Sequence, residues 1–324
     1  DAYSNIGIAL KGIRFNKPNS GLMEIIVSLI DQRTSCRPRE IAEAAISLLK
    51  LEPDLKELLE KHSLGTLRQS LKETIYTLAK LPLLLKLMSV CPIADLELES
   101  ILVDIRSALL ASLDTILISP AILRVQSALA LQCFTNEYIY NQTDKETKLL
   151  EVLEVVIEKT LSNGQQPSPQ AILCLASYKA LNEYKWFDLI TVSTDIEEVF
   201  ARQVREYKEE SRLKANIPIL QKITNKVSSK VRAQYEENPY PRWVNLKLSL
   251  RSQATPQLVK KLNLMIFDNA ATDRPAPNIL IAGCGTGEHS IETASRFKDC
   301  KVLAVDLSLS SLAYAKRKTE ELGL

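Results

Sequence analysis

The sequence predicts a mainly α N-terminal region with repeat-like helices, followed by the first half of an α/β domain. Almost every segment from residue 3 to about residue 205 has helical apolar periodicity. The short apolar runs at 278–283 and 301–307 have instead the length and composition of buried parallel strands. Only 9 of the 324 residues are glycine, and three of these lie in the loop Gly283–Gly287 between those runs. Such a concentration indicates that the backbone needs glycine there.

The composition excludes several classes of function. The formal net charge of +2 is close to neutral and no basic run occurs, so no nucleic-acid partner is indicated. The six cysteines are scattered singly without a C-x-x-C pair, which argues against a zinc-ribbon metal site. No stretch approaches the roughly 20 apolar residues of a membrane span, and no signal-peptide layout is present. These features favour a cytoplasmic protein with reduced thiols.

The helical region contains segments of different exposure. Residues 38–51 and 98–117 each gather their apolar side chains on one face. Residues 121–134 are apolar almost all round, which predicts a buried central helix. Residues 146–164 form an amphipathic pattern that stops at Asn163–Gly164, a usual helix C-terminus. A further helix is predicted at 171–181 after a break.

The first part of this region resembles a tetratricopeptide repeat. "AYSNIGIAL" is similar to the first helix of such a repeat, and "IAEAAISLLKLEPD" (41–54) to the end of the second, although about 20 extra residues separate them. We therefore interpret 1–55 as the degenerate end of a repeat array whose earlier members lie upstream, and 56–215 as an α-helical domain. An ordinary helical hairpin is the alternative for 1–55.

The third predicted domain, 216–324, begins with a transition segment. A helix is predicted at 219–237, ending before Asn238 because the residue that precedes Pro239 is driven out of the helical region. The prolines of "NPYPRW" favour an extended segment. A helix at about 255–267 and a polar loop at 268–278 are expected to follow.

The last 47 residues read as strand, helix, strand and helix, at 278–283, 286–297, 301–307 and 308–323. Strands joined by short loops and a helix form a right-handed βαβ unit, the opening of a doubly wound, Rossmann-like sheet. Ligands bind at the carboxyl ends of such strands, where the glycine loop and Asp306 are expected. A carboxylate at that place accepts hydrogen bonds from the ribose hydroxyls of an adenosine cofactor.

The spacing also bears on which cofactor binds. The dinucleotide fingerprint is G-x-G-x-x-G, whereas this loop reads G-x-G-x-G and places Glu288 where the third glycine of that fingerprint would lie. A carboxylate there would repel a pyrophosphate, which disfavours a nucleotide-dependent oxidoreductase. S-adenosylmethionine has no phosphate and carries a sulfonium, so it tolerates a nearby carboxylate.

"ILIAGCGTG" with "VLAVDLS" resembles motif I and the following acidic strand end of class I S-adenosylmethionine-dependent methyltransferases. "QYEENPYPRW" resembles the segment upstream of this motif in bacterial proteins that fuse a tetratricopeptide array to such an enzyme. The resemblance is close over 228–324 and loose elsewhere. It implies S-adenosyl-L-methionine as cofactor and the following cofactor-binding residues: Gly283, Gly285 and Gly287 beneath the methionine and ribose, Asp306 on the ribose hydroxyls, Leu307 beside the adenine, and Tyr235 or Arg242 near the carboxylate.

The pattern departs from the family at Ile281, where many members have an acidic residue, so the contact to the methionine amino group must come from elsewhere. Aromatic packing is the competing interpretation of Tyr235, Tyr240 and Trp243. No catalytic residue or metal ligand is predicted. His289 is expected to be a partly exposed helix residue, and Cys284 a small filler.

The leading hypothesis is the N-terminal part of an S-adenosylmethionine-dependent methyltransferase, whose helical region selects a protein or peptide acceptor. The alternative is a helical interaction module with an incomplete, non-catalytic cofactor unit. The family's sheet has seven strands, and two are predicted here. We therefore expect a fragment that continues at both ends and shows no methyl transfer alone.

Overall fold

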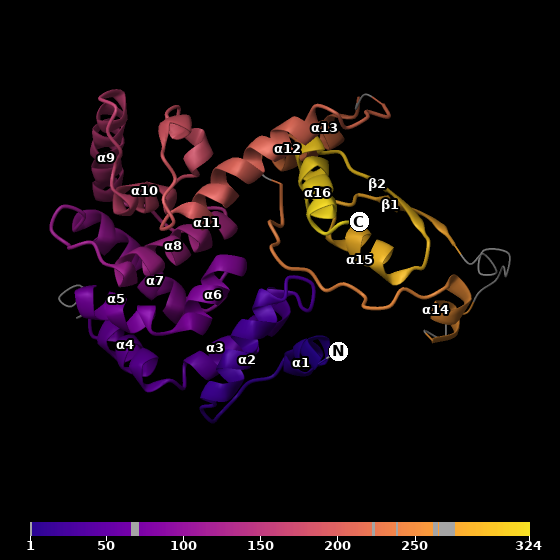
Figure 1. Ribbon diagram of the computed structural model, residues 1–324, viewed down its shortest axis with the longest axis horizontal. Coiled ribbons are helices and arrows are strands. Elements are labelled where there is room, and N and C mark those ends of the chain that lie inside the picture. Colours follow the sequence, from indigo (N-terminus) through magenta and orange to yellow (C-terminus); the bar gives the residue numbers. More distant parts are fainter. Residues whose placement is uncertain (1, 66–70, 222–223, 238, 262–264, 266–275) are drawn as a thin grey trace. The chain divides into compact units, whose positions relative to one another are not determined.

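The computed structural model describes residues 2–65, 71–221, 224–237, 239–261, 265 and 276–324 (Figure 1). The chain forms two compact units. The helical unit comprises residues 2–32 and 36–205, and the C-terminal unit comprises residues 33–35 and 206–324. The predicted division at residue 55 and the tetratricopeptide identity of 1–55 stay predictions.

The helical unit consists of helices joined by short connections. Several begin with proline in the first turn, where a missing N–H costs no hydrogen bond. The elements are α1 (Ala2–Leu10), α2 (Ser20–Asp31), α3 (Pro38–Leu49), α4 (Pro53–Ser63), α5 (Leu71–Ala79), α6 (Pro82–Val90), α7 (Leu96–Ala111), α8 (Pro120–Thr135), α9 (Asp144–Ser162), α10 (Pro169–Ala176), the 3₁₀ turns η2 (Leu181–Glu183) and η3 (Phe187–Leu189), α11 (Glu197–Phe200) and the π-helical segment η4 (Ala201–Arg205).

Helix α8 lies at the centre of this unit, as its all-round apolar sequence predicts. Nearly all of its residues are buried, and it packs against α5, α6 and α10. Helix α9 is amphipathic and buries Leu153, Ile157 and Leu161. It ends at Ser162 with Asn163 as its C-cap, and Gly164 follows with φ +74°, which confirms the predicted stop at Asn163–Gly164.

The C-terminal unit ends in the predicted strand–helix–strand–helix unit. Its elements are α12 (Glu206–Lys214), α13 (Lys226–Glu237), α14 (Thr255–Lys261), β1 (Asn278–Ala282), α15 (Glu288–Arg296), β2 (Lys301–Val305) and α16 (Leu309–Glu321). The two strands pair in parallel, with Asn278 opposite Lys301 and Ala282 opposite Val305. The fold class is therefore confirmed: a mainly helical region precedes the start of a Rossmann-like βαβ domain.

Two helices of the C-terminal unit, α13 and α14, differ from their predicted bounds. The helix expected to begin at residue 219 begins at Lys226, because Asn225 caps it: its side-chain oxygen accepts from the amides of Val227 (2.9 Å) and Ser228 (3.1 Å). Helix α14 is described to Lys261. Of its expected continuation to residue 267, only Met265 is described. Asn238, where the preceding helix is predicted to end, and residues 268–275 of the expected loop lie outside the described residues.

The prediction that both strands are buried is wrong. Leu280 and Leu303 lie opposite each other in the register and are 66% and 61% exposed, whereas Ile281 is buried. Because side chains alternate along a strand, the described sheet has one covered and one exposed face. A small core forms beside the sheet from Trp243, Leu246, Ile291 and Tyr314.

Candidate cofactor site

The glycine loop connects β1 to α15 and adopts a conformation that favours glycine. Gly283, Gly285 and Gly287 have φ of +72°, +52° and +86°. The amides of Gly283 and Cys284 donate to the carbonyl of Val305, at 2.8 and 3.1 Å, which ties the loop to the end of β2. The amide of Gly287 donates to the carbonyl of Cys284 at 3.0 Å and closes a tight turn.

The three glycines differ in what a side chain would meet. A Cβ on Gly287 would lie 2.5 Å from the Cβ of Ala315, so this glycine allows the start of α15 to approach α16. A Cβ on Gly283 or Gly285 would meet no atom within 4 Å. At these two positions the backbone faces open space that a ligand can occupy.

Asp306 follows β2 and holds the loop directly. One carboxylate oxygen accepts from the amide of Gly285 at 2.8 Å, and the other from the amide of Ser308 at 2.9 Å. An ionised carboxylate has about four acceptor positions. Asp306 therefore keeps capacity for about two further donors, which is what a ribose diol would supply.

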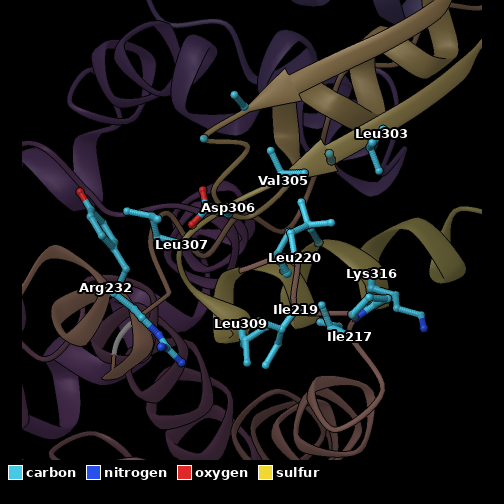
Figure 2. Close-up of a pocket in the computed structure, with 18 of the residues that line it drawn as sticks. Ile217, Ile219, Leu220, Arg232, Leu303, Val305, Asp306, Leu307, Leu309 and Lys316 are labelled. Carbon is cyan, nitrogen blue, oxygen red and sulfur yellow. The ribbon is translucent and has the colours of Figure 1, made fainter. Parts of the chain in front are cut away.

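A pocket of about 1330 Å³ lies within the C-terminal unit beside these residues. Gly283, Gly287, Asp306, Leu307 and Tyr235 line it, and the sequence singles out all five. Figure 2 shows Asp306 and Leu307 together with apolar side chains of the segment 217–220. Gly285 and Arg242 are not among the residues that line this pocket.

The carboxyl end of α13 is attached to the start of α16, next to Asp306. Ser308 caps α16 by accepting from the amide of Ser311 at 3.0 Å, and its hydroxyl donates to the carbonyl of Tyr235 at 2.9 Å. Ser310 donates to the carbonyl of Glu236 at 2.8 Å. These contacts hold Tyr235, which is 40% exposed, at the pocket wall.

Glu236 adds an ion pair to this attachment. Lys214 lies 2.7 Å from its carboxylate. Burial alone would raise the pKa of Glu236, but the hydrogen bonds from Lys214 and from the Ser310 amide hold it below its ordinary value. Sequence reasoning missed Glu236 and the bonds of Ser308 and Ser310 to the end of α13, because these bonds join residues more than 70 positions apart.

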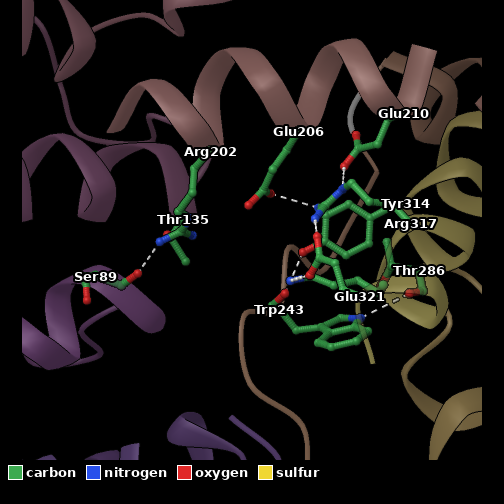
Figure 3. A network of polar contacts seen from close by, with 11 residues as sticks. Ser89, Thr135, Arg202, Glu206, Glu210, Trp243, Thr286, Tyr314, Arg317 and Glu321 are labelled. Carbon is green, nitrogen blue, oxygen red and sulfur yellow. Dashed lines mark hydrogen bonds and ion pairs between the residues drawn. The ribbon is translucent and has the colours of Figure 1, made fainter. Parts of the chain in front are cut away.

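The segment Pro241–Trp243, which precedes the sheet in the chain, contacts the glycine loop at Thr286. The indole N–H of Trp243 donates to the carbonyl of Thr286 at 3.0 Å (Figure 3). The Thr286 hydroxyl donates to the carbonyl of Pro241 at 2.9 Å. Trp243 is 7% exposed and packs edge-on against Tyr314, whereas Tyr240 is 58% exposed. Aromatic packing therefore describes Trp243 but not Tyr240. Burial raises the pKa of Glu210, and the charges of Arg317 and then Arg242 oppose this rise without cancelling it.

The nucleophilic and basic side chains of the loop agree with their modest predicted roles. Burial, followed by the charge of Asp306, raises the pKa of Cys284 to about 11, so its thiol stays protonated at neutral pH. His289 is exposed. Over the described residues there is no group of three or more His, Cys, Asp or Glu side chains placed to hold a metal ion. Nor does the described part contain a helix with the length and apolar character needed to cross a membrane.

Comparison with known proteins supports one family for the C-terminal end. A family model described as "Methyltransferase domain" matches residues 279–324, which run from β1 through the glycine loop to the end of α16. No curated protein and no solved structure matches the chain. The C-terminal portion of this chain, after a long helical region, therefore carries a methyltransferase domain.

Proposed function

We propose that the C-terminal unit binds S-adenosyl-L-methionine as part of a methyltransferase. The observation that carries this proposal is the pairing of the glycine loop with Asp306 at the carboxyl ends of two parallel strands, inside a methyltransferase-family match. Proteins of the family whose model matches residues 279–324 typically use S-adenosyl-L-methionine.

The residues fit the cofactor. The open sides of Gly283 and Gly285 let the methionine portion approach the backbone. The free acceptor positions of Asp306 suit the ribose hydroxyls, and Leu307, which is 42% exposed and lines the pocket, offers an apolar surface for the adenine. Tyr235 also lines the pocket, and its exposed aromatic side chain is available for a further contact with the ligand. Bound there, the cofactor would supply a methyl group activated by its sulfonium.

Calorimetric titration with S-adenosylmethionine, S-adenosylhomocysteine and NAD tests this proposal. We expect the two sulfur compounds to bind and NAD not to bind, because Glu288 lies at the start of α15 where a pyrophosphate would sit. Asp306→Ala should weaken binding by roughly 10- to 100-fold, since it removes a charged acceptor and releases Gly285. Glu320→Gln, an exposed change on α16, is the matched control. Equal binding by Asp306→Ala and by the wild type would overturn the assignment.

We further propose that the helical unit selects a protein or peptide acceptor. A cavity of about 510 Å³ within this unit supports the idea. Its wall includes apolar side chains of α2, α6 and α8 together with charged residues of both signs, which can contact the apolar and charged groups of a peptide. The charged residues are Asp31, Lys86, Arg124, Asp195 and Glu198.

Charge reversal at this cavity separates selection from cofactor binding. Arg124→Glu in the full-length protein should lower methyl incorporation into its acceptor at least several-fold, while the affinity for S-adenosylhomocysteine stays unchanged. Lys145→Glu, an exposed residue of α9 outside the cavity, is the control. If the full-length protein binds a partner through this unit but transfers no methyl group, the alternative of an interaction module is favoured.

A further inference from the structure

Thr286 occupies an unusual position in the glycine loop. It lies between Gly285 and Gly287, both with positive φ, yet it is 2% exposed. Both its hydroxyl and its carbonyl are bonded to residues more than forty positions away, Pro241 and Trp243. The centre of the loop is therefore held from outside the βαβ unit.

Trp243 is itself fixed in place. Its own carbonyl accepts from the hydroxyl of Tyr314 at 2.5 Å, and its ring packs against Tyr314 with the centroids 6.0 Å apart. The ammonium of Lys318 lies 5.2 Å from the indole centroid. Both residues belong to α16, which also lines the cofactor pocket (Figure 3). The indole thus joins α16 to the loop through an ordered set of contacts.

A loop with glycine on either side of a single residue has many accessible backbone conformations. Two sets of hydrogen bonds limit these conformations. Asp306 accepts from the amide of Gly285, and the Pro241–Trp243 segment bonds to the hydroxyl and the carbonyl of Thr286. The first contact comes from the residue that follows β2, and the second comes from the segment that precedes the sheet. Together they fix both sides of the Gly285–Thr286 peptide.

We propose that Pro241–Trp243 is a clasp that holds the glycine loop in its cofactor-binding conformation, and that Thr286 and Trp243 are positioning residues for the cofactor. This inference rests on the proposed function. The clasp does not touch the ligand: neither Thr286 nor Trp243 lines the pocket. Its effect on affinity comes from ordering the loop before the ligand arrives, so that binding does not have to order it.

Two substitutions at Thr286 provide the sharpest test. Thr286→Val keeps the branched shape but removes the hydroxyl, leaving the carbonyl of Pro241 without this donor. Thr286→Ser keeps the hydroxyl and loses a methyl group. For the full chain, Thr286→Val should weaken the binding of S-adenosylhomocysteine by roughly 3- to 15-fold, the range expected for one hydrogen bond, and Thr286→Ser should retain most of the affinity.

Hydrogen exchange distinguishes a clasp from general stabilisation. In the ligand-free chain, Thr286→Val should speed exchange in peptides that cover residues 283–288 and leave the peptides of α16 unchanged. Trp243→Phe should also speed exchange in the peptides that cover residues 283–288, since it removes the N–H donor but keeps an aromatic ring. Trp186→Phe is the control: Trp186 is buried in the helical unit, and its indole N–H has no partner there.

The chain has two tryptophans, so Trp186→Phe also leaves Trp243 as a single fluorescent reporter beside the loop. Its emission should change on titration with S-adenosylhomocysteine. Unchanged loop exchange in both Thr286→Val and Trp243→Phe would overturn the clasp. The clasp would also be overturned if the losses of affinity in Thr286→Val and Thr286→Ser are proportional to the decreases in their melting temperatures. If the wild type binds no sulfur cofactor, the proposed function fails, and loop exchange still decides whether the clasp exists.

Discussion

Each of the two units contains an arginine that is less than 5% exposed, and the charges of these two arginines are satisfied in different ways. Arg106 of the helical unit is 2% exposed, and Arg317 of the C-terminal unit is 4% exposed. A buried guanidinium must find partners for its donors, because desolvation without them is costly. What those partners are decides how each unit responds to pH.

Arg106 is surrounded mainly by neutral groups. It donates to the carbonyl of Asn141 at 2.6 Å, and it lies 4.2 Å from the ring centroid of Tyr178. The Glu146 carboxylate lies 3.9 Å from the Arg106 guanidinium. Its shorter contacts are hydrogen bonds from the Thr143 amide (2.8 Å) and the Tyr178 hydroxyl (2.7 Å). Carbonyls and aromatic rings do not titrate near neutral pH, so this arrangement keeps its charge balance over a wide range.

Arg317 is surrounded by carboxylates instead. Glu206 lies 2.8 Å and Glu210 2.9 Å from its guanidinium, and Glu321 forms a third pair (Figure 3). The pairs with Glu206 and Glu210 join α12 to α16 within the C-terminal unit, and the pair with Glu321 lies within α16. The carboxyl groups of Glu210 and Glu321 have shifted pKa values, so α16, which lines the cofactor pocket, rests partly on contacts that depend on pH.

The largest expected effect lies in the helical unit. Glu146→Ala should lower the free energy of unfolding by about 3–5 kcal/mol, because it leaves Arg106 buried without a carboxylate, Tyr178 without its acceptor and the Thr143 amide without its partner in the capping box of α9. Chemical denaturation of the full chain measures this. Glu151→Ala, an exposed change on the same helix, should have little effect. Equal stability of the two variants would show that the network around Arg106 contributes nothing.

A smaller effect distinguishes the two units by its sign. Burial raises the pKa of Glu146, but its hydrogen bonds outweigh that effect and leave the pKa below 4.5; for Glu210, burial prevails over Arg317 and the pKa lies above 4.5. The stability from Glu146 is present above pH 4.5 and is lost as the pH falls through its folded-state pKa. That from Glu210 is present below pH 4.5 and is lost as the pH rises through its folded-state pKa.

Substitution by glutamine should reveal these opposite signs. Between about pH 3 and pH 6, the cost of Glu146→Gln should grow with pH, and the cost of Glu210→Gln should shrink. Denaturation midpoints at four pH values, with Glu320→Gln as an exposed control, measure both slopes. Slopes of the same sign would contradict the contrast drawn between the two units.

The parts that sequence could predict are those fixed by local pattern. The glycine loop, the strand-end Asp306 and the buried helix α8 each depend on residues close together in the chain. The Thr143–Glu146 capping box is also readable locally, as T-x-x-E. The contact of Glu146 with Tyr178 is not, because it joins residues 32 positions apart.

The remaining differences have the same origin. The bond between Trp243 and Thr286 spans 43 residues, and no spacing rule predicts it. The exposure of Leu280 and Leu303 could not be foreseen, because an apolar run predicts a strand but not which of its faces is covered. Helix α13 begins later than its periodicity suggests because the Asn225 side chain competes for the first amides.

The closeness of Gly287 to Ala315 has a mechanical consequence. A shift of α16 along its axis by one turn, about 5.4 Å, would bring Ser311 or Thr319 to the place of Ala315. Either side chain is larger than alanine and would meet the start of α15. The close contact between Gly287 and Ala315 therefore fixes the axial position of α16 relative to the glycine loop. It thereby also fixes where Leu312 and Lys316 of α16 lie in the pocket wall.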